Sequence, residues 1–134
     1  MAKDKFFYVG QKAFINNNGK ILVMEADNGL DFPGGKIQEG ETDFEESLKR
    51  EVNEETGLEI KIGDPFAVWH RVCLSGKHGG KTIFLVGYKC EFTGGEVTIS
   101  DEHLNYEWVN KENYQKLDDG GLYFKALEKY FLGS

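Results

Sequence analysis

Hydrophobic and polar residues alternate over several stretches of the chain, and this alternation predicts β-strands. The first two predicted strands, residues 8–15 and 20–26, flank a segment that reads Asn-Asn-Asn-Gly, and Asn-Gly is typical of the tight turn in a hairpin. A loop containing glycine and proline is predicted over residues 30–40. Further strands are predicted in the second half of the chain, at residues 66–74, 82–92, 97–100 and 106–109.

A different period, close to four residues, predicts a helix over residues 43–56. Its apolar positions form one stripe, Phe44, Leu48 and Val52, while most of its other positions are charged. Two residue pairs can form a capping box at its start, namely Asp43 with Glu46, or Thr42 with Glu45. Gly57 lies where a left-handed residue commonly ends a helix.

A second helix is predicted over residues 123–132, where apolar residues recur at helical spacing. Strands on both sides of a central helix, with a terminal helix to cover the sheet, favour an α/β or an α+β sandwich. At 134 residues, 40% of them hydrophobic, the chain suits a single domain over residues 1–134. A chain of this size needs no disulfide or zinc site to hold its core.

The net charge of −7 argues against an extended surface for nucleic acid, because such surfaces bind phosphates through lysine and arginine. A small anionic substrate is still compatible with this charge if bound cations reverse the local field. The sequence contains no apolar run of about 20 residues, so we expect no membrane span. The only cysteines, Cys73 and Cys90, are typical of reduced thiols, and no leader pattern precedes the first strand. We therefore expect a cytoplasmic protein.

The predicted helix 43–56 carries three glutamates on one face. Glu51, Glu54 and Glu55 are spaced i, i+3 and i+4, so their carboxylates repel one another unless a positive charge compensates. Arg50 is expected to help from one side of that face. Oxygen ligands alone favour a hard ion, Mg²⁺ or Mn²⁺. Taken by itself, however, the spacing is more typical of a solvated acidic face.

The glycine loop before the helix changes this interpretation. Gly34 and Gly35 lack side chains, so their backbone can approach an ion or a phosphate closely, and a carbonyl there can complete a coordination shell. A mobile turn is the alternative explanation for the two glycines, but it would not require this particular helix to follow. The two segments together therefore favour a metal site for phosphate chemistry.

The combined pattern resembles the Nudix box, and the chain is similar to the smaller MutT-type members of that family. The box consists of a glycine, five residues, a glutamate, seven residues and then Arg-Glu-aliphatic-x-Glu-Glu-x-Gly-aliphatic. The matching positions here are Gly35, Glu41, Arg50, Glu51, Val52, Glu54, Glu55, Gly57 and Leu58. One departure stands out, because eight residues rather than seven separate Glu41 from Arg50. The extra residue falls near Asp43, before the helix proper, and puts the approach of Glu41 in question.

The resemblance implies a single α/β domain of Nudix type, an α/β/α sandwich with a mixed β-sheet between helices. It also implies a role for each matched residue. Glu51 and Glu55 would be the principal metal ligands, and Glu54 a further ligand or the base that deprotonates water. The carbonyl of Gly34 would also touch metal, beside Gly35. The remaining roles are supporting ones: Arg50 would orient the carboxylates, and Glu41 would support the helix or bind a second ion.

Many family members carry another glutamate in a loop before a tryptophan. Glu102, six residues before Trp108, occupies such a position and is a candidate metal ligand or base. Asp101 and Glu96 compete for this role, and a plain surface carboxylate is an equally good explanation of Glu102. His103, by contrast, has no base or nucleophile beside it in sequence, so the sequence assigns it no role.

The implied activity is hydrolysis of a diphosphate linkage in a small nucleotide-like substrate, most simply as a magnesium-dependent (d)NTP pyrophosphohydrolase of MutT type. Family markers for dinucleoside polyphosphate and ADP-ribose enzymes, a tyrosine and a proline respectively, are absent from residues 66–82. The alternative is a catalytically silent Nudix-fold module that binds nucleotides or regulates. Such relatives usually lose box glutamates, whereas this chain keeps them all. Neither the base, sugar and leaving group nor the oligomeric state follows from the sequence.

Overall fold

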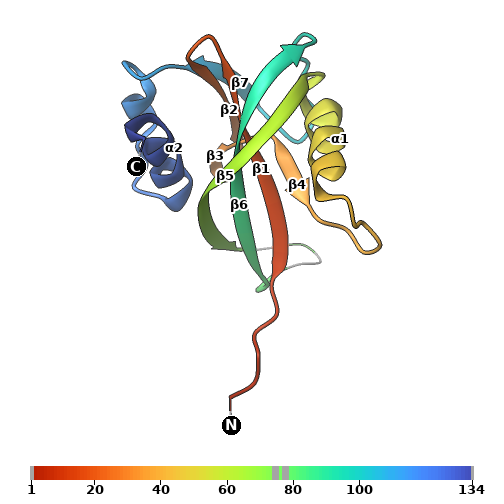
Figure 1. Ribbon diagram of the computed structural model, residues 1–134. Helices are drawn as coiled ribbons and strands as arrows, with labels where there is room; N and C mark the ends of the chain where they lie inside the picture. Colours follow the sequence, from red (N-terminus) through yellow and green to blue (C-terminus); the bar gives the residue numbers. More distant parts are fainter. Residues whose placement is uncertain (1, 74–75, 77–78, 134) are drawn as a thin grey trace.

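A single mixed sheet forms the centre of the molecule, with a helix against each of its faces (Figure 1). The computed structural model describes residues 2–73, 76 and 79–133. Its strands are β1 (Tyr8–Asn17), β2 (Lys20–Ala26), β3 (Gly29–Asp31), β4 (Gly34–Lys36), β5 (Glu59–Val72), β6 (Thr82–Gly94) and β7 (Asn105–Val109). Its helices are α1 (Phe44–Thr56), the short 3-10 helix η2 (Tyr114–Leu117) and α2 (Leu122–Leu132).

The sheet is built around β1. The strand order is β3-β2-β1-β6-β5, with β4 paired to β1 and β7 paired to β2. β1 runs parallel to β6 but antiparallel to β2 and β4, so the sheet is mixed. The predicted hairpin is confirmed, because Asn17 pairs with Lys20 across the turn, where Asn18 and Gly19 both adopt positive φ.

Two hydrophobic cores lie on opposite faces of this sheet. One lies under α2 and η2 and is rich in aromatic rings, among them Phe14, Phe32, Trp69, Tyr114 and Phe124. The other lies under α1 and is mostly aliphatic, with Ala13, Ile15, Leu22, Leu48 and Val52 among its members. Neighbouring residues of β1 thus serve opposite cores, as the alternation along a strand requires. The predicted α/β/α sandwich is confirmed.

Helix α1 begins and ends close to its predicted limits. The side chain of Asp43 accepts a hydrogen bond from the backbone nitrogen of Glu46, and Gly57 closes the helix with φ of 75°. The extra residue near Asp43 therefore lies before the first helical turn and leaves the glutamate spacing unchanged. Within the predicted apolar stripe, Leu48 and Val52 are buried, whereas Phe44, in the first turn, is about half exposed.

Three strand predictions need correction. The predicted loop 30–40 contains β3 and β4, because its backbone pairs with β2 and β1. No strand forms at residues 97–100, since the amides of Thr98 and Ser100 bond to the carbonyls of Thr56 and Glu55 at the end of α1. β5 starts at Glu59, earlier than predicted, and bulges around Pro65 let it follow β6 along its length. Residue 74, the predicted end of that strand, lies outside the described residues.

Within the part of the chain that the structure describes, no helix has the length and apolar character needed to span a bilayer.

Candidate active site

The glycine loop and the glutamate helix meet directly. The backbone N–H of Gly34, in β4, donates a hydrogen bond of 2.9 Å to Oε1 of Glu55, in α1. Gly35 lies against Glu51, and a Cβ atom placed on Gly35 would lie 2.6 Å from Oε2 of that glutamate. The absence of a side chain at Gly35 is therefore what lets the loop approach the helix.

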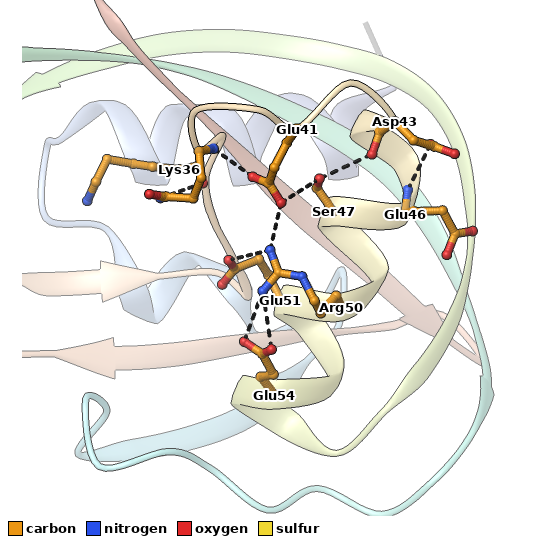
Figure 2. Close-up of polar contacts among 9 residues, drawn as sticks. Lys36, Glu41, Asp43, Glu46, Ser47, Arg50, Glu51 and Glu54 are labelled. Carbon is orange, nitrogen blue, oxygen red and sulfur yellow. Dashed lines mark hydrogen bonds and ion pairs between the residues drawn. The ribbon is translucent and has the colours of Figure 1, made fainter.

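The outer part of the site is a set of carboxylates gathered around Arg50 (Figure 2). Nη2 of Arg50 lies 2.8 Å from Glu41 and 3.3 Å from Glu51, and Nη1 lies 3.2 Å from Glu54. Arg50 was expected to lie to one side of the glutamate face, but its long side chain folds back across that face. It supplies the positive charge that offsets repulsion between Glu51 and Glu54. Partial burial raises the pKa of Glu51.

Glu41 reaches α1 in spite of the extra residue in the box. Its Oε1 accepts a hydrogen bond from the backbone of Gln38, and its Oε2 accepts one of 2.9 Å from the hydroxyl of Ser47 (Figure 2). Together with Arg50, these donors lower the pKa of Glu41 below its ordinary value. Glu41 therefore ties the loop to the helix. Its role in the site, as a support for the helix or as a ligand of a second ion, stays a prediction.

The inner part of the site is a buried chain of charged groups. Nδ1 of His103 lies 3.8 Å from Oε2 of Glu55, and Nε2 of His103 lies 3.0 Å from Oδ2 of Asp31. The other oxygen of Asp31 lies 2.9 Å from Nζ of Lys12, on β1. The side chain of His103 is only 3% exposed. This row of charged side chains links β1, β3, α1 and the loop before β7.

Burial and pairing shift the pKa values of these groups in opposite directions. Burial raises the pKa of Glu55 to about 7, although Lys12 and the Gly34 amide partly oppose the shift. Burial would also raise the pKa of Asp31, but Lys12 and His103 hold it well below its usual range. The hydrogen bond that His103 donates to the carboxylate of Asp31 raises the pKa of His103. Glu55 is thus a carboxylate whose charge is poorly stabilised by the protein alone.

The raised pKa of Glu55 predicts a difference in stability between the wild type and Glu55→Gln. A carboxyl whose pKa is raised in the folded state stabilises the fold below its unfolded pKa, near 4.5, and loses this contribution as pH rises through 7. In chelator at pH 8 we therefore expect Glu55→Gln to be more stable than the wild type by roughly 1–3 kcal/mol. Urea unfolding at pH 8 and pH 5 measures this difference, which should shrink at the lower pH.

The charged groups that face Glu55 are the same in both proteins, namely Lys12, Asp31 and His103. The comparison therefore isolates the effect of the side chain at position 55. A variant that is less stable than the wild type at both pH values would contradict the assignment of Glu55 as a strained buried carboxylate. Glu45→Gln, an exposed change on the same helix, is the matched control and should show no pH-dependent difference.

A cavity of about 220 Å³ opens beside this inner part of the site. Gly34, Gly35 and Glu55 line it on one side, and Glu102 lines it from the loop before β7. The structure thus brings Glu102 to the same cavity as Glu55, whereas its competitors Asp101 and Glu96 are not among the lining residues. Glu51 and Glu54 lie outside the cavity, on the side of α1 that Arg50 covers.

Three members of the buried chain were not predicted: Lys12, Asp31 and His103. No local pattern marks them, because their partners lie far away in sequence; His103 and Asp31 are 72 residues apart. Asp31 directly precedes the Phe-Pro-Gly-Gly segment before the box, which was its only sequence signal. His103 adjoins the candidate Glu102, but nothing in the sequence indicates that its ring is buried.

The donor chemistry of the site fits a hard divalent cation. The available ligands are carboxylate oxygens and the backbone of Gly34, without sulfur, which suits Mg²⁺ or Mn²⁺. Across residues 2–73, 76 and 79–133, no three His, Cys, Asp or Glu side chains converge on a single point. The reason is visible in the pairing: Glu51 and Glu54 are drawn toward Arg50, while Glu55 faces His103.

Known proteins resemble this chain over most of its length. The NUDIX domain family matches residues 9–129. Nucleoside triphosphatase NudI of Enterobacter sp. (strain 638) is 34% identical over 119 residues, which cover 78% of this chain and 82% of the relative. NudI of Klebsiella pneumoniae subsp. pneumoniae is 33% identical over 118 residues, with the same shares covered.

Solved structures also resemble this chain over most of its length. The crystal structure of the MutT protein from Methanosarcina mazei Go1 has a TM-score of 0.77 and 25% identity, covering 97% of this chain and 96% of that one. The solution structure of the E. coli ORF135 protein has a TM-score of 0.74 and 25% identity, covering 94% and 89%. With the NUDIX domain spanning residues 9–129 and relatives more than 30% identical over most of their length, this protein belongs to the Nudix hydrolase family.

Proposed function

We propose that the protein is a (d)NTP pyrophosphohydrolase of MutT type, which depends on Mg²⁺ or Mn²⁺ and cleaves a diphosphate linkage in a nucleoside triphosphate. The observation that carries this proposal is the meeting of Gly34 and Glu55 at the wall of a cavity that Glu102 also lines. A buried carboxylate with a raised pKa, beside a glycine backbone and an accessible second carboxylate, suits hydrolysis of a phosphoanhydride linkage.

The proposed metal ligands are Glu51, Glu54, Glu55 and the carbonyl of Gly34. A divalent ion held there would neutralise charge on the substrate phosphates and make water a better nucleophile. It would also relieve the unfavourable burial of charge on Glu55. The preference of a hard ion for oxygen ligands supports magnesium or manganese over zinc.

Other groups of the chain would position the reactants. Arg50 holds Glu41, Glu51 and Glu54 in one cluster, so it would orient ligands rather than touch substrate. Glu54 and Glu102 are the two candidates for the general base that takes a proton from water. Both are exposed side chains, as a group that exchanges protons with solvent must be.

The substrate class rests on the relatives. The two NudI proteins are named as nucleoside triphosphatases, and the Methanosarcina mazei structure is named as a MutT protein. We therefore extend nucleoside triphosphate hydrolysis to this chain. A catalytically silent module is the competing function, and its one support was the extra residue near Asp43. Since Glu41 still contacts Arg50 and Ser47, that support is weak.

The test is release of pyrophosphate or phosphate from a panel of ribo- and deoxynucleoside triphosphates and nucleotide sugars. Each compound is assayed with magnesium, with manganese and with chelator. Cleavage of a triphosphate that needs the metal and yields pyrophosphate is the expected result. Folded protein that binds metal yet cleaves none of the panel would favour the silent module.

A substitution at Gly35 should damage activity more than stability. In Gly35→Ala the new methyl group would lie 2.6 Å from Oε2 and 2.7 Å from Cδ of Glu51, so this flexible side chain must move. Because Glu51 is a proposed ligand, we expect kcat to fall by about tenfold or more, while the melting temperature changes by only a few degrees. Enzyme assays and thermal unfolding measure the two effects. Gly94→Ala, in β6 and outside the cavity, should leave kcat unchanged.

A further inference from the structure

A second cavity adjoins the one beside Glu55. It has a volume of about 590 Å³ and shares four lining residues with the smaller cavity, namely Asn28, Asp31, Arg71 and Tyr123. The two cavities therefore meet at these residues. Sites for small ligands usually measure about 300–1,000 Å³, so the 220 Å³ cavity alone is too small for a nucleotide. A nucleotide whose phosphates lie near Glu55 must extend past this junction into the larger cavity.

The lysine and arginine side chains near the junction differ in whether a carboxylate already neutralises their charge. Lys12 is paired with Asp31, and Arg50 is surrounded by carboxylates outside the cavity. Among the described residues, Lys36 and Arg71 line the small cavity and form no ion pair with a carboxylate. Of these two, only Arg71 also lines the larger cavity.

Arg71 also has a neutral neighbour at the junction. It lies near the end of β5 and is half-buried, and it opposes the rise in pKa that burial causes in the phenol of Tyr123, in α2. Tyr123 is itself packed against Phe32 and Trp69 in the aromatic core. A guanidinium beside a neutral phenol, with no carboxylate partner, keeps its full charge and its N–H groups for a ligand.

We propose that Arg71 binds phosphate oxygens of the substrate at the junction of the two cavities, and that Tyr123 positions its guanidinium for this contact. The ligand class is the phosphate chain of a nucleotide, with the nucleoside directed into the larger cavity. That cavity offers apolar surface from Leu30, Val72 and Leu122, which suits a base and sugar better than a phosphate chain. This inference rests on the proposed function and adds a substrate-binding residue outside the Nudix box.

The test measures the affinity of the protein for the α,β-methylene analogues of the common deoxynucleoside triphosphates, in magnesium buffer. Glutamine at position 71 removes the charged hydrogen bonds to phosphate, so we expect Arg71→Gln to weaken binding by about tenfold or more. Arg71→Lys should recover part of this loss, because it restores the charge but not the fork of donors. Lys61→Gln is the matched control, since it removes the same charge from the same strand but lines neither cavity, and its affinity should stay within about twofold.

Two further readouts separate a substrate contact from a structural role. The uncharged deoxynucleosides should bind Arg71→Gln and the wild type equally, and the substitution should raise KM more than it lowers kcat. Tyr123→Phe should weaken binding of the analogues in the same direction, but less than Arg71→Gln.

Equal affinity of the wild type and Arg71→Gln for the analogues would overturn the inference, even if the triphosphates are hydrolysed. Equal weakening of deoxynucleoside and analogue binding would overturn it too, because a lost phosphate contact cannot affect a ligand without phosphate. If the wild type neither binds the analogues nor hydrolyses any triphosphate, the proposed function itself fails. Thermal unfolding of each variant checks that a folded protein is being compared.

Discussion

Glu51→Gln and Glu55→Gln are each expected to lower kcat by about 100- to 1,000-fold while the protein stays folded. Glutamine keeps the size and one oxygen of glutamate but loses the negative charge that holds a divalent cation. Neither change should disturb packing, because Glu51 lies at the edge of the outer carboxylate cluster and Glu55 keeps an oxygen that can accept from Gly34.

Metal binding gives a readout that does not depend on turnover. Calorimetric titration with Mg²⁺ or Mn²⁺ should show weaker binding for both variants than for the wild type. Glu45→Gln is the control on the same helix, because Glu45 is exposed in the first turn and lies away from the glycine loop. Its activity and metal affinity should match those of the wild type. Near-normal turnover in either Glu51→Gln or Glu55→Gln would remove the proposed metal site.

The two effects expected for Glu55→Gln have opposite signs, and this contrast is informative. The same substitution should lower kcat by about 100- to 1,000-fold and should stabilise the metal-free protein above neutral pH. Both follow from one property of position 55, a carboxylate buried where its charge is poorly satisfied until a cation binds. A purely structural glutamate would lose stability on substitution and would leave metal affinity unchanged.

The sequence predicted the parts of the fold that depend on local pattern. Alternation located the hairpin of β1 and β2, and a four-residue period located α1 between Asp43 and Gly57. Where prediction was wrong, pairing between distant segments decided the outcome. Glycine-rich backbone became β4 because β1 offered it partners, and residues 97–100 bonded to the end of α1 instead of joining the sheet.

The candidate site was also predictable from the sequence only in part. The contacts of Gly34 and Gly35 with α1 follow from the glycine loop and the helix spacing, so the sequence predicted which segments meet. The Lys12–Asp31–His103 chain behind Glu55 was not predictable, since each link joins residues from different elements. Arg71 was missed for a similar reason: its place between two cavities depends on how β5 lies beside α2.

Gly34→Ala is expected to destabilise the protein by about 3–5 kcal/mol, or to prevent folding, because two separate costs combine. The φ angle of Gly34 is 152°, a conformation that residues with a Cβ atom rarely adopt. The added Cβ would also overlap the carbonyl oxygen of Gln11 and lie 2.9 Å from its carbonyl carbon. These are backbone atoms of β1, which cannot move without breaking the pairing of β1 with β4.

A substitution at Gly40 allows the conformational cost of a positive φ angle to be measured without the steric cost of an overlapping Cβ atom. Gly40 lies in the turn between β4 and α1 with φ of 88°, and a Cβ atom there would meet nothing within 4 Å. Gly40→Ala therefore carries the conformational cost alone and should lose only about 1 kcal/mol. Urea unfolding of both variants measures the difference, with far-UV circular dichroism as a check on folding. Equal, small losses in the two proteins would mean that β1 and β4 are not packed as closely as the structure places them. The close approach of Gly34 to Glu55, on which the proposed metal site depends, would then be in doubt as well.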